Sequence, residues 1–409
     1  MTSQFDDVVS EQYEKWTYPD PIHDIGEWVG TNWQWFDPIH AYLQFWPDRP
    51  YRPDLDILIA GCGSNQSAVI AYNNRSAKVV GIDISQRSLD HAQYLKERHE
   101  LTNLELHRLP VEEVSTLGRD FDLIMSTGVL HHLADPPQGM KALADCLKPD
   151  GVTALMLYAR YGRIGVELMQ SVFRDLGLRQ DDDGVRKVKE TISALDQRHP
   201  FISYRETAPD LYYDAGLVDT CLHGRDRSFT TGDCIDLVTD AGLVFQRWHL
   251  NAPYYPHDTE SLSAPASEFY QLMSEQPERK MWSLLERIRS SNACHFFTAT
   301  HADRPKRSYV IDFSSPDALD YVPRLRLKCG LSGAELSRPA WSLTLNAADL
   351  PFVQHINRQR TIREIATAVG QPGNDSVEQE LYENAARRLF QSLWRLDFLD
   401  MSLEAVGKS

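Results

Sequence analysis

The sequence contains no long hydrophobic run, which argues against a membrane-spanning helix. Its longest apolar candidate, around Val152 to Tyr158, has the length of a strand, whereas a helix needs about 20 apolar residues to cross a bilayer. The polar start from Met1 to Asp7 also lacks the basic and apolar pattern of a secretion signal. We therefore expect a cytoplasmic protein with no membrane partner.

Paired cysteines are also absent from the sequence. No two cysteines form a Cys-x-x-Cys pair, and the six are scattered at Cys62, Cys146, Cys221, Cys234, Cys294 and Cys329. Disulfides and a cysteine zinc site are therefore not expected, and we assign no metal.

Basic residues are too few to balance the acidic ones. The chain has 42 lysines and arginines against 58 acidic residues, a formal net charge of −16 at pH 7. Because proteins bind nucleic-acid phosphates by neutralising them, this charge argues against a duplex nucleic-acid partner. A basic cluster between Arg160 and Lys189 is interleaved with aspartates, so a solvated helical face is favoured over a site for an anionic substrate.

A buried strand followed by a glycine turn is the most informative pattern that the sequence does contain. Apolar residues fill both faces of the run from Leu55 to Ala60, and Gly61 and Gly63 then allow a tight turn into a helix. Asp83 ends the next expected strand, where a carboxylate can accept both hydroxyls of a ribose. Gln66 replaces the third glycine of a dinucleotide motif, so the loop has no pyrophosphate to bind.

Two further segments make the pattern specific. The run from Phe121 to Leu133 and the turn from Leu147 to Val152 follow the first two motifs in order. Together the four motifs resemble those of class I S-adenosylmethionine-dependent methyltransferases. The resemblance implies S-adenosylmethionine as the cofactor and a Rossmann-like, doubly wound α/β fold with seven strands.

Apolar runs alternating with helical spacing predict the elements of this fold. Strands are expected at Ile57–Ala60, Lys78–Asp83, Leu104–Arg108, Phe121–Ser126, Val152–Tyr158, Val244–Leu250 and Cys294–His301, of which the family pairs the last two at one sheet edge. Helices are expected at Asn65–Asn74, Ser85–His99, Pro137–Leu147, Val166–Leu176, Gly184–Leu195 and Thr231–Ala241.

The same analysis divides the chain into four parts. We expect an aromatic-rich N-terminal cap at 1–50, a methyltransferase domain at 51–303, a strand-poor linker at 304–344 and a mainly α module at 345–409. Insertions at about 161–229 and 251–291 are interpreted as a lid over the acceptor, because ligands of open α/β sheets bind beyond the carboxyl ends of the strands.

The resemblance and the residues together identify candidate cofactor contacts. They are Tyr13, Tyr18, Ala60, Gly61, Cys62, Gly63, Asn65, Gln66, Asp83, Ile84, Leu109, Pro110, Val111, Thr127, Gly128, Val129 and His131. Asn65 stands where the family commonly has a small residue, so its amide is expected near the methionine end. An acidic adenine ligand after the third strand is replaced by Leu109 to Val111, with Glu112 as a further candidate.

Candidate catalytic residues are histidines, since a neutral imidazole can accept a proton near neutral pH. His131 and His132 follow the fourth strand, and His223 belongs to a polar cluster with Arg225, Asp226 and Arg227; a purely orienting or loop-bracing role stays open for all of them. Candidate acceptor contacts are Trp16, Tyr158, Arg160, Tyr161 and Arg225.

The C-terminal module has its own pattern. Helical spacing at Ala348–Asn357, Thr361–Val369 and Glu378–Leu396 is followed by a short strand at Phe398–Met401. This order resembles a winged-helix-like unit of the kind that accompanies some bacterial protein methyltransferases. Acidic residues offset the arginines of the third helix, so protein interaction or homodimerisation is favoured over DNA binding.

The resulting prediction is methyl transfer, by in-line displacement, to a small molecule or a protein side chain. A non-catalytic S-adenosylmethionine-binding regulator that acts through the C-terminal module is the alternative.

Overall fold

The computed structural model describes residues 7–257, 262, 267–339, 341–370 and 376–403. The chain divides into two compact units, which are described separately. The first contains residues 1–37, 53–245 and 286–303, and the second contains residues 38–52, 246–285 and 304–409. No helix among the described residues is both long and apolar enough to span a membrane.

A seven-stranded sheet forms the centre of the first unit, with the strand order β3-β2-β1-β4-β5-β7-β6. The strands are β1 (Asp56–Ala60), β2 (Lys78–Asp83), β3 (Leu104–Arg108), β4 (Phe121–Thr127), β5 (Leu147–Tyr158), β6 (Leu243–Trp248) and β7 (Cys294–His301). The first five pair in parallel, whereas β7 runs antiparallel to β5. This confirms the predicted doubly wound α/β fold.

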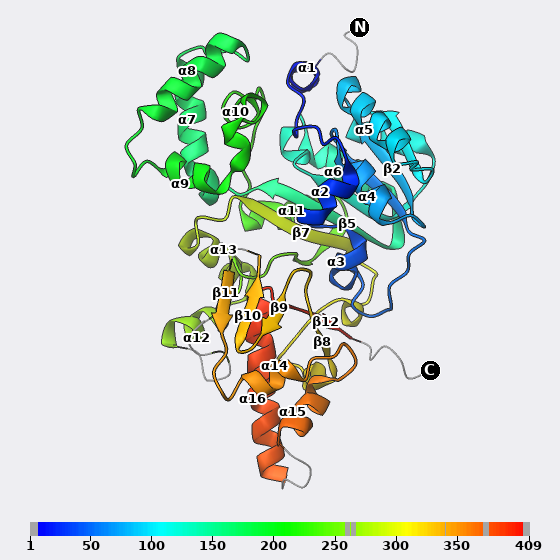
Figure 1. The fold of residues 1–409 in the computed structure, drawn as a ribbon, viewed down its shortest axis with the longest axis vertical. Helices are drawn as coiled ribbons and strands as arrows, with labels where there is room; N and C mark the ends of the chain where they lie inside the picture. The colour runs from blue at the N-terminus through cyan, green and yellow to red at the C-terminus, as the bar shows by residue number, and fades with distance from the viewer. Residues whose placement is uncertain (1–6, 258–261, 263–266, 340, 371–375, 404–409) are drawn as a thin grey trace. The chain divides into compact units, whose positions relative to one another are not determined.

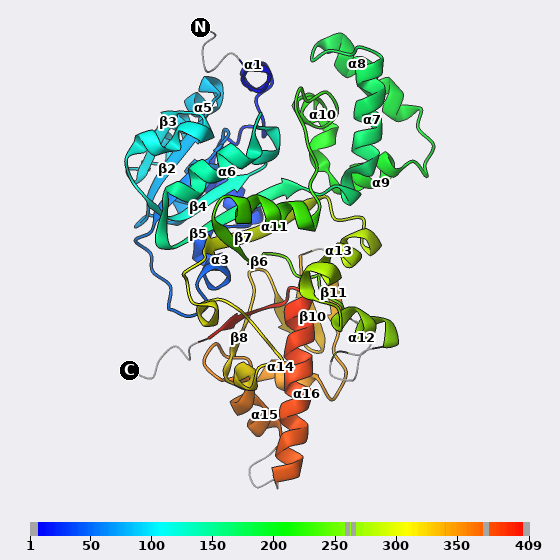
Figure 2. The same ribbon diagram turned by 180° about the vertical axis from the view of Figure 1, so that it is seen from behind.

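Helices cover both faces of this sheet (Figures 1 and 2). Helices α2 (Ile25–Thr31) and α4 (Gln66–Asn73) lie on one face, and α6 (Pro136–Asp145) and α11 (Thr231–Asp240) on the other. Between them, the residues of β1 from Ile57 to Ala60 are completely buried. This burial on both faces explains why β1 has no polar residue after Asp56.

Polar side chains fix where several helices begin. The Ser85 hydroxyl accepts a hydrogen bond from the Ser88 amide at the start of α5 (Gln86–Arg98). Thr230 and Asp233 form a capping box at the start of α11, where each side chain accepts from the other residue's backbone amide. Short 3-10 turns η1 (Val111–Leu117) and η2 (Leu130–His132) follow β3 and β4.

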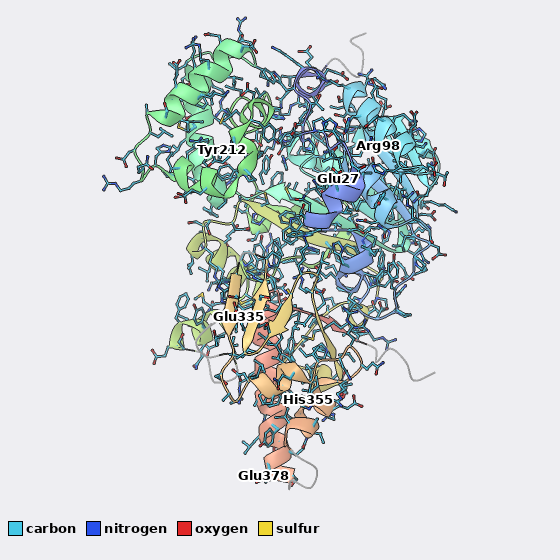
Figure 3. The ribbon with its side chains drawn as sticks, viewed as in Figure 1. Glu27, Arg98, Tyr212, Glu335, His355 and Glu378 are labelled. Carbon is cyan, nitrogen blue, oxygen red and sulfur yellow. The ribbon has the colours of Figure 1, made fainter. Side chains whose placement is uncertain are left out.

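The insertion after β5 is a helical subdomain with its own core. It contains η3 (Tyr161–Arg163), α7 (Ile164–Asp175), α8 (Asp182–Ser193), α9 (Pro200–Thr207), η4 (Pro209–Tyr212) and α10 (Asp214–Cys221). The predicted helices at 166–176 and 184–195 are present as α7 and α8. Buried residues such as Val166, Phe173 and Phe201 pack together inside it, whereas Tyr212 is 67% exposed (Figure 3).

The second unit contains α3 (Pro38–Phe45), α12 (Glu268–Ser274) and a C-terminal run of α14 (Leu350–Gln354), α15 (Ile362–Gly370), α16 (Ser376–Arg395) and β12 (Leu399–Ser402). Helix α13 (Glu278–Ile288) begins in this unit and ends in the first. Helices and strand thus follow the predicted order. Leu389, Phe390 and Leu393 of α16 are fully buried in the core of this unit. The winged-helix likeness stays an interpretation.

The expectation of a strand-poor linker over 304–344 is wrong. This segment contains β8 (Val322–Leu325), β9 (Gly330–Ser332), β10 (Glu335–Arg338) and β11 (Trp341–Thr344). The last three form an antiparallel sheet, and β8 pairs with β12. Strands of three or four residues offer too few positions for an alternating pattern to be recognised.

The unit boundaries also differ from the predicted domains. Residues 38–52 of the expected cap and 246–285, which include most of the expected insertion at 251–291, belong to the second unit. The Asn251 amide donates to Asp397 Oδ1 at 2.7 Å, a contact across 146 residues that no local pattern reveals. Residues 258–261 and 263–266 of this insertion lie outside the described residues.

Candidate active site

A cavity of about 730 Å³ lies at the carboxyl ends of the central parallel strands. Residues at or just after the ends of β1, β2, β4 and β5 line it, together with the N-terminal segment and helix α10 of the insertion. Its volume is within the roughly 300–1,000 Å³ typical of small-molecule sites. Its position is where open α/β sheets bind ligands.

The loop after β1 needs its two glycines. Gly61 has φ +74°, and a Cβ there would lie 2.3 Å from Cγ2 of Val129; Gly63 has φ +53°. Larger residues would be strained at both positions, so the backbone can approach a ligand closely. The Cys62 side chain between them is buried, and burial raises the pKa of its thiol, which keeps it un-ionised at neutral pH.

Asp83 at the end of β2 is braced by backbone amides. Its Oδ2 accepts from the Gly63 amide at 2.8 Å and its Oδ1 from the Ser85 amide at 2.9 Å. Each carboxylate oxygen retains acceptor capacity, and the side chain lines the cavity. Burial raises the pKa of Asp83, while these amides oppose the rise. The carboxylate is therefore positioned to accept the hydroxyls of a ribose.

The N-terminal segment is fastened to the same loop. The Ser64 hydroxyl donates to the Pro19 carbonyl at 2.9 Å. Asn65 donates from Nδ2 to the Asp20 carbonyl at 2.9 Å and accepts from the Ile22 amide at 3.2 Å. Asn65 lines the cavity, but both ends of its amide hold this segment in place. These hydrogen bonds explain why Asn65 stands where the family commonly has a small residue.

Asp219 on helix α10 lies beside Tyr158 at the end of β5, and two strands, β1 and β4, separate β5 from β2, where Asp83 lies. Asp219 is 1% exposed, and its two oxygens accept from the hydroxyls of Tyr13 at 2.8 Å and Tyr158 at 3.4 Å. Burial raises the pKa of Asp219 to about 7, although the bond from Tyr13 lowers it. Burial likewise raises the pKa of both phenols. Near neutral pH this carboxyl group can therefore take up or release a proton.

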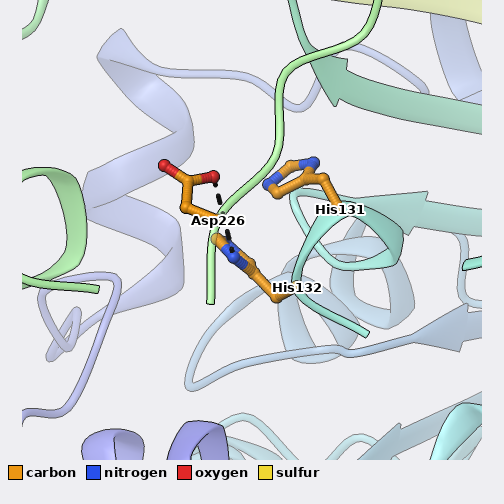
Figure 4. Close-up of side chains that lie close together, drawn as sticks. All are labelled: His131, His132 and Asp226. Atoms are coloured by element: carbon orange, nitrogen blue, oxygen red, sulfur yellow. Dashed lines mark ion pairs between the residues drawn. The ribbon is translucent and has the colours of Figure 1, made fainter. Parts of the chain in front are cut away.

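Two buried histidines, His132 and His223, lie beside this carboxylate, and a third, His131, lies against His132. The ring of His132 stacks on that of His223, with centroids 3.8 Å apart, and His131 stacks on Tyr158 at 3.9 Å. Burial lowers the pKa of all three imidazoles, which are therefore neutral at pH 7. His132 lines the cavity, and its Nδ1 lies 4.0 Å from Asp226 Oδ1 (Figure 4).

Hydrogen bonds determine which nitrogen of two of these rings carries the proton. His132 Nδ1 lies 2.9 Å from the Arg225 carbonyl and must donate to it, which leaves a lone pair on Nε2. His223 Nδ1 accepts from the Arg225 amide at 3.0 Å, so its proton is on Nε2, 3.4 Å from the Tyr13 hydroxyl oxygen. Neither nitrogen of His131 has a hydrogen-bond partner.

Arg163 packs on the ring of Tyr158, which also stacks on His131. Its guanidinium lies 3.6 Å from the centre of the Tyr158 ring and is almost fully buried. It also donates to Asp226 at 2.9 Å and to the Tyr204 hydroxyl at 2.7 Å. The charge of Arg163 is thus paired with Asp226, and the aromatic wall of the cavity is held rigidly.

Most predicted cofactor residues line the cavity. These are Tyr13, Tyr18, Gly61, Cys62, Gly63, Asn65, Gln66, Asp83, Ile84, Leu109, Pro110, Val111, Thr127, Gly128 and Val129, together with Glu112. Ala60 and His131 are not among the described lining residues. Ala60 is buried in β1 below the loop, and His131 is buried behind Tyr158.

The predicted acceptor residues are more dispersed. Only Tyr158 is among the described residues that line the cavity. Trp16 donates to the Gln180 carbonyl and borders a separate cavity of about 420 Å³. Arg160 is exposed and donates to Ser228, Tyr161 lies in η3, and Arg225 forms a bidentate pair with Asp7.

Asp219 and Tyr213, which both line the cavity from the insertion, were not predicted from the sequence. Arg163 belongs to the basic cluster that was expected on a solvated helical face; for this residue the expectation is wrong, because Arg163 is 1% exposed. An isolated aspartate on a helix of an insertion carries no motif, so no local signal could have singled out Asp219. The insertion as a whole was expected over the acceptor, which stays a prediction; in the structure, Tyr213 and Asp219 of the insertion line the cavity.

Two groups of side chains have the spacing of a metal site, namely His131-His132-Asp226 and His132-Asp219-His223, whose ligand atoms lie within 4.8 Å of one another. In the second group, the proton on His223 Nε2 occupies the nitrogen that would have to bind the metal. In the first, His132 Nδ1 is already bonded to the Arg225 carbonyl. We therefore assign hydrogen-bonding roles to these residues.

Comparisons with known proteins identify the fold and the domain. Residues 58–153 match a family described as a methyltransferase domain. An uncharacterized protein of Synechococcus sp. is 28% identical over 88% of this chain and 86% of its own length. The tRNA U34 carboxymethyltransferase of Azotobacter vinelandii is 30% identical over 36% of this chain, and the match covers 46% of that enzyme.

Among solved structures, PKMT2 from Rickettsia typhi has the same fold, with a TM-score of 0.64 at 12% identity over 94% of this chain and 77% of that one. A second structure of PKMT2, in complex with AdoHcy, gives a TM-score of 0.63 at 13% identity, over 90% of this chain and 75% of that one. The family match and the sheet lead to one conclusion: residues 58–153 of the chain form a methyltransferase domain, which lies in a seven-stranded α/β sheet.

Proposed function

We propose that the chain transfers the methyl group of S-adenosylmethionine to a small-molecule or protein side-chain acceptor by in-line displacement. The observation that carries this proposal is a single cavity with two chemically different ends. Asp83 and the apolar segment from Leu109 to Val111 line one end, and Tyr158 and Asp219 line the other.

The residues of the first end fit an adenosine and a methionine group. Asp83 would accept the ribose hydroxyls, and the segment Leu109 to Val111 after β3 would contact the base. The glycines at 61 and 63 leave room for the ligand along the backbone. When bound, S-adenosylmethionine supplies an electrophilic methyl group on a positively charged sulfur.

The strand order indicates where the acceptor enters. Asp83 ends β2, and β1, β4 and β5 follow it across the sheet. A ligand with its ribose at β2 and its methionine part over the β1 loop directs its reactive group toward β4 and β5. Tyr158 ends β5, so the acceptor would approach from the side of Tyr158, His132 and Asp219. Much of the rate enhancement would come from holding the two reactants in line.

The experiment is a transfer assay with S-adenosylmethionine that carries a labelled methyl group. The purified chain is incubated with a cell extract, and the products are separated by size into small molecules and proteins. We expect label in one fraction and its loss with Asp83→Ala. A chain that binds the cofactor in calorimetry but labels neither fraction would instead fit a non-catalytic binding protein.

A further inference from the structure

The acceptor end of the cavity contains a carboxylate with no cation beside it. Asp219 is buried and accepts hydrogen bonds only from the phenols of Tyr13 and Tyr158 among the described residues. Two neighbouring carboxylates are paired, Asp226 with Arg163 and Asp7 with Arg225, both at 2.9 Å, and Asp210 accepts from the Tyr18 hydroxyl at 3.0 Å. No ion pair among the described residues includes Asp219. Since a buried charge is costly without a partner, this end of the cavity is suited to a positively charged ligand.

We propose that the acceptor is an alkylamine, which Asp219 binds as its ammonium ion and from which Asp219 removes a proton before methyl transfer. This inference rests on the proposed function and names the acceptor class for the same site.

Two acceptors at this end lie close enough together for one ammonium group to reach both. Two acceptors that each lie about 2.9 Å from a tetrahedral nitrogen are about 4.7 Å apart. A carboxylate oxygen of Asp219 and one ring nitrogen of His132 are no more than 4.8 Å apart. Because His132 Nδ1 donates to the Arg225 carbonyl, its Nε2 is the nitrogen that can accept from the amine. The ring of Tyr13, which also lines the cavity, adds aromatic surface, which attracts cations.

Other acceptor chemistries fit this end of the cavity less well. A carboxylate or a thiolate would meet the charge of Asp219 with a charge of the same sign. An alcohol could donate one hydrogen bond to Asp219 but carries no charge of its own to pair with the carboxylate. An ammonium ion supplies both a donor and a full positive charge in direct contact.

The proposed step balances in protons and electrons. Asp219 takes one proton from the ammonium group and becomes a neutral carboxylic acid, and the nitrogen regains its lone pair. That pair forms the new carbon–nitrogen bond as the carbon–sulfur bond breaks, and the electrons of the broken bond remain on sulfur. The product is a methylated ammonium ion, and the proton on Asp219 is released to water.

The charge state of Asp219 depends on several neighbouring groups. The groups that interact with it are Tyr13, Tyr18, Tyr158, Tyr204, Tyr213, Cys221, His132, His223, Arg163, Asp210 and Asp226. The five tyrosines and Cys221 keep their protons, because burial raises their pKa values. The two histidines are neutral, and the charges of Arg163 and Asp226 offset each other. Asp219 is therefore the group at this end whose charge changes near pH 7.

The test asks which atom receives the methyl group. Small-molecule and protein fractions of a cell extract are each treated with acetic anhydride, which blocks amines, or left untreated, and then incubated with the chain and methyl-labelled S-adenosylmethionine. We expect the label on nitrogen. In the fraction that is labelled, the sample treated with acetic anhydride should contain at least tenfold less label than the untreated sample. The fraction that is labelled distinguishes a free amine from a lysine side chain. Label on oxygen, sulfur or carbon would overturn the amine assignment but leave the proposed function intact. No label in any fraction would contradict both.

Two variants test the role of Asp219. Asp219→Asn keeps the size of the side chain but cannot take a proton, and we expect a 10²- to 10⁴-fold loss of turnover. In the wild-type protein we expect kcat/KM to decrease on the acidic side, at or below pH 7, and this acidic limb of the pH profile should be absent from Asp219→Asn. Asp214→Asn changes an exposed carboxylate on the same helix, paired with Lys189, and should leave turnover and the limb unchanged.

A readout independent of turnover is the infrared band of the protonated carboxyl group. In the free protein this band should appear as the pH falls through about 7, and it should be missing from Asp219→Asn. A folded Asp219→Asn variant that keeps the limb, or a wild-type spectrum without such a band, would show that Asp219 is not the proton acceptor.

Discussion

The most informative single substitution is Asp83→Ala, because Asp83 alone is expected to hold the ribose. Loss of two hydrogen bonds to a charged group, at about 1.5–3 kcal/mol each, is partly offset when water enters, and we expect a net loss of roughly 2–4 kcal/mol. This corresponds to a roughly 30- to 700-fold weaker affinity, at about 1.4 kcal/mol per tenfold change. Isothermal calorimetry with S-adenosylhomocysteine measures it directly.

The same substitution also affects the loop that Asp83 braces. It removes the acceptor for the amides of Gly63 and Ser85, so the unfolding temperature must be measured in parallel. Asp83→Asn retains one carbonyl oxygen and should lose less affinity than Asp83→Ala. Asp90→Ala, an exposed change on α5, serves as the control. A folded Asp83→Ala variant with unaltered affinity would refute the ribose assignment.

Three further predictions follow from packing and charge. Gly61→Ala should lower the unfolding temperature more than Gly128→Ala. Both glycines have positive φ, but only a Cβ at position 61 would lie 2.3 Å from the Val129 side chain. Equal decreases in the unfolding temperature would contradict this. Burial lowers the pKa of His131 in the folded protein, so the unfolded chain binds a proton at His131 more readily and stability is lost as pH falls below about 6.5. In denaturant titrations, His131→Gln should therefore reduce the slope of unfolding free energy against pH by up to about 1.4 kcal/mol per pH unit. An unchanged slope would contradict this role of His131. Phe390→Ala should lower the unfolding free energy of the second unit by about 3–5 kcal/mol in denaturant titration, because Phe390 is fully buried in its core. Cofactor affinity in calorimetry should be unchanged, since every described residue that lines the cavity belongs to the first unit; weakened binding would contradict this.

The sheet and the cofactor end of the cavity could be predicted from the sequence because their signals are local. β2, β3 and β7 have the predicted bounds. In β2 an apolar run carries the signal, whereas β3 alternates Leu104 and Leu106 with polar residues. Gly61, Gly63 and Asp83 lie in short motifs whose spacing is fixed by the strand-turn-helix connection. Local patterns of this kind can be recognised in a single sequence.

The acceptor end could not be predicted in the same way. Asp219 meets Tyr13 and Tyr158 only because α10 folds back over the strand ends, which brings together residues 206 and 61 positions apart. Arg160 and Tyr161 come soon after β5 and were therefore predicted to contact the acceptor. In the structure the chain turns into η3 at Tyr161, and neither residue is among the described residues that line the cavity. The short strands β8 to β11 were missed because each has only three or four residues.

The central claim is that one cavity holds S-adenosylmethionine at Asp83 and the acceptor at Asp219. A crystal structure of the full chain with S-adenosylhomocysteine tests it most directly. The claim predicts ribose hydroxyls within hydrogen-bond distance of the Asp83 carboxylate and the sulfur facing Tyr158 and Asp219. A complex with the ribose away from Asp83, or with the sulfur turned from the β5 end, would contradict it.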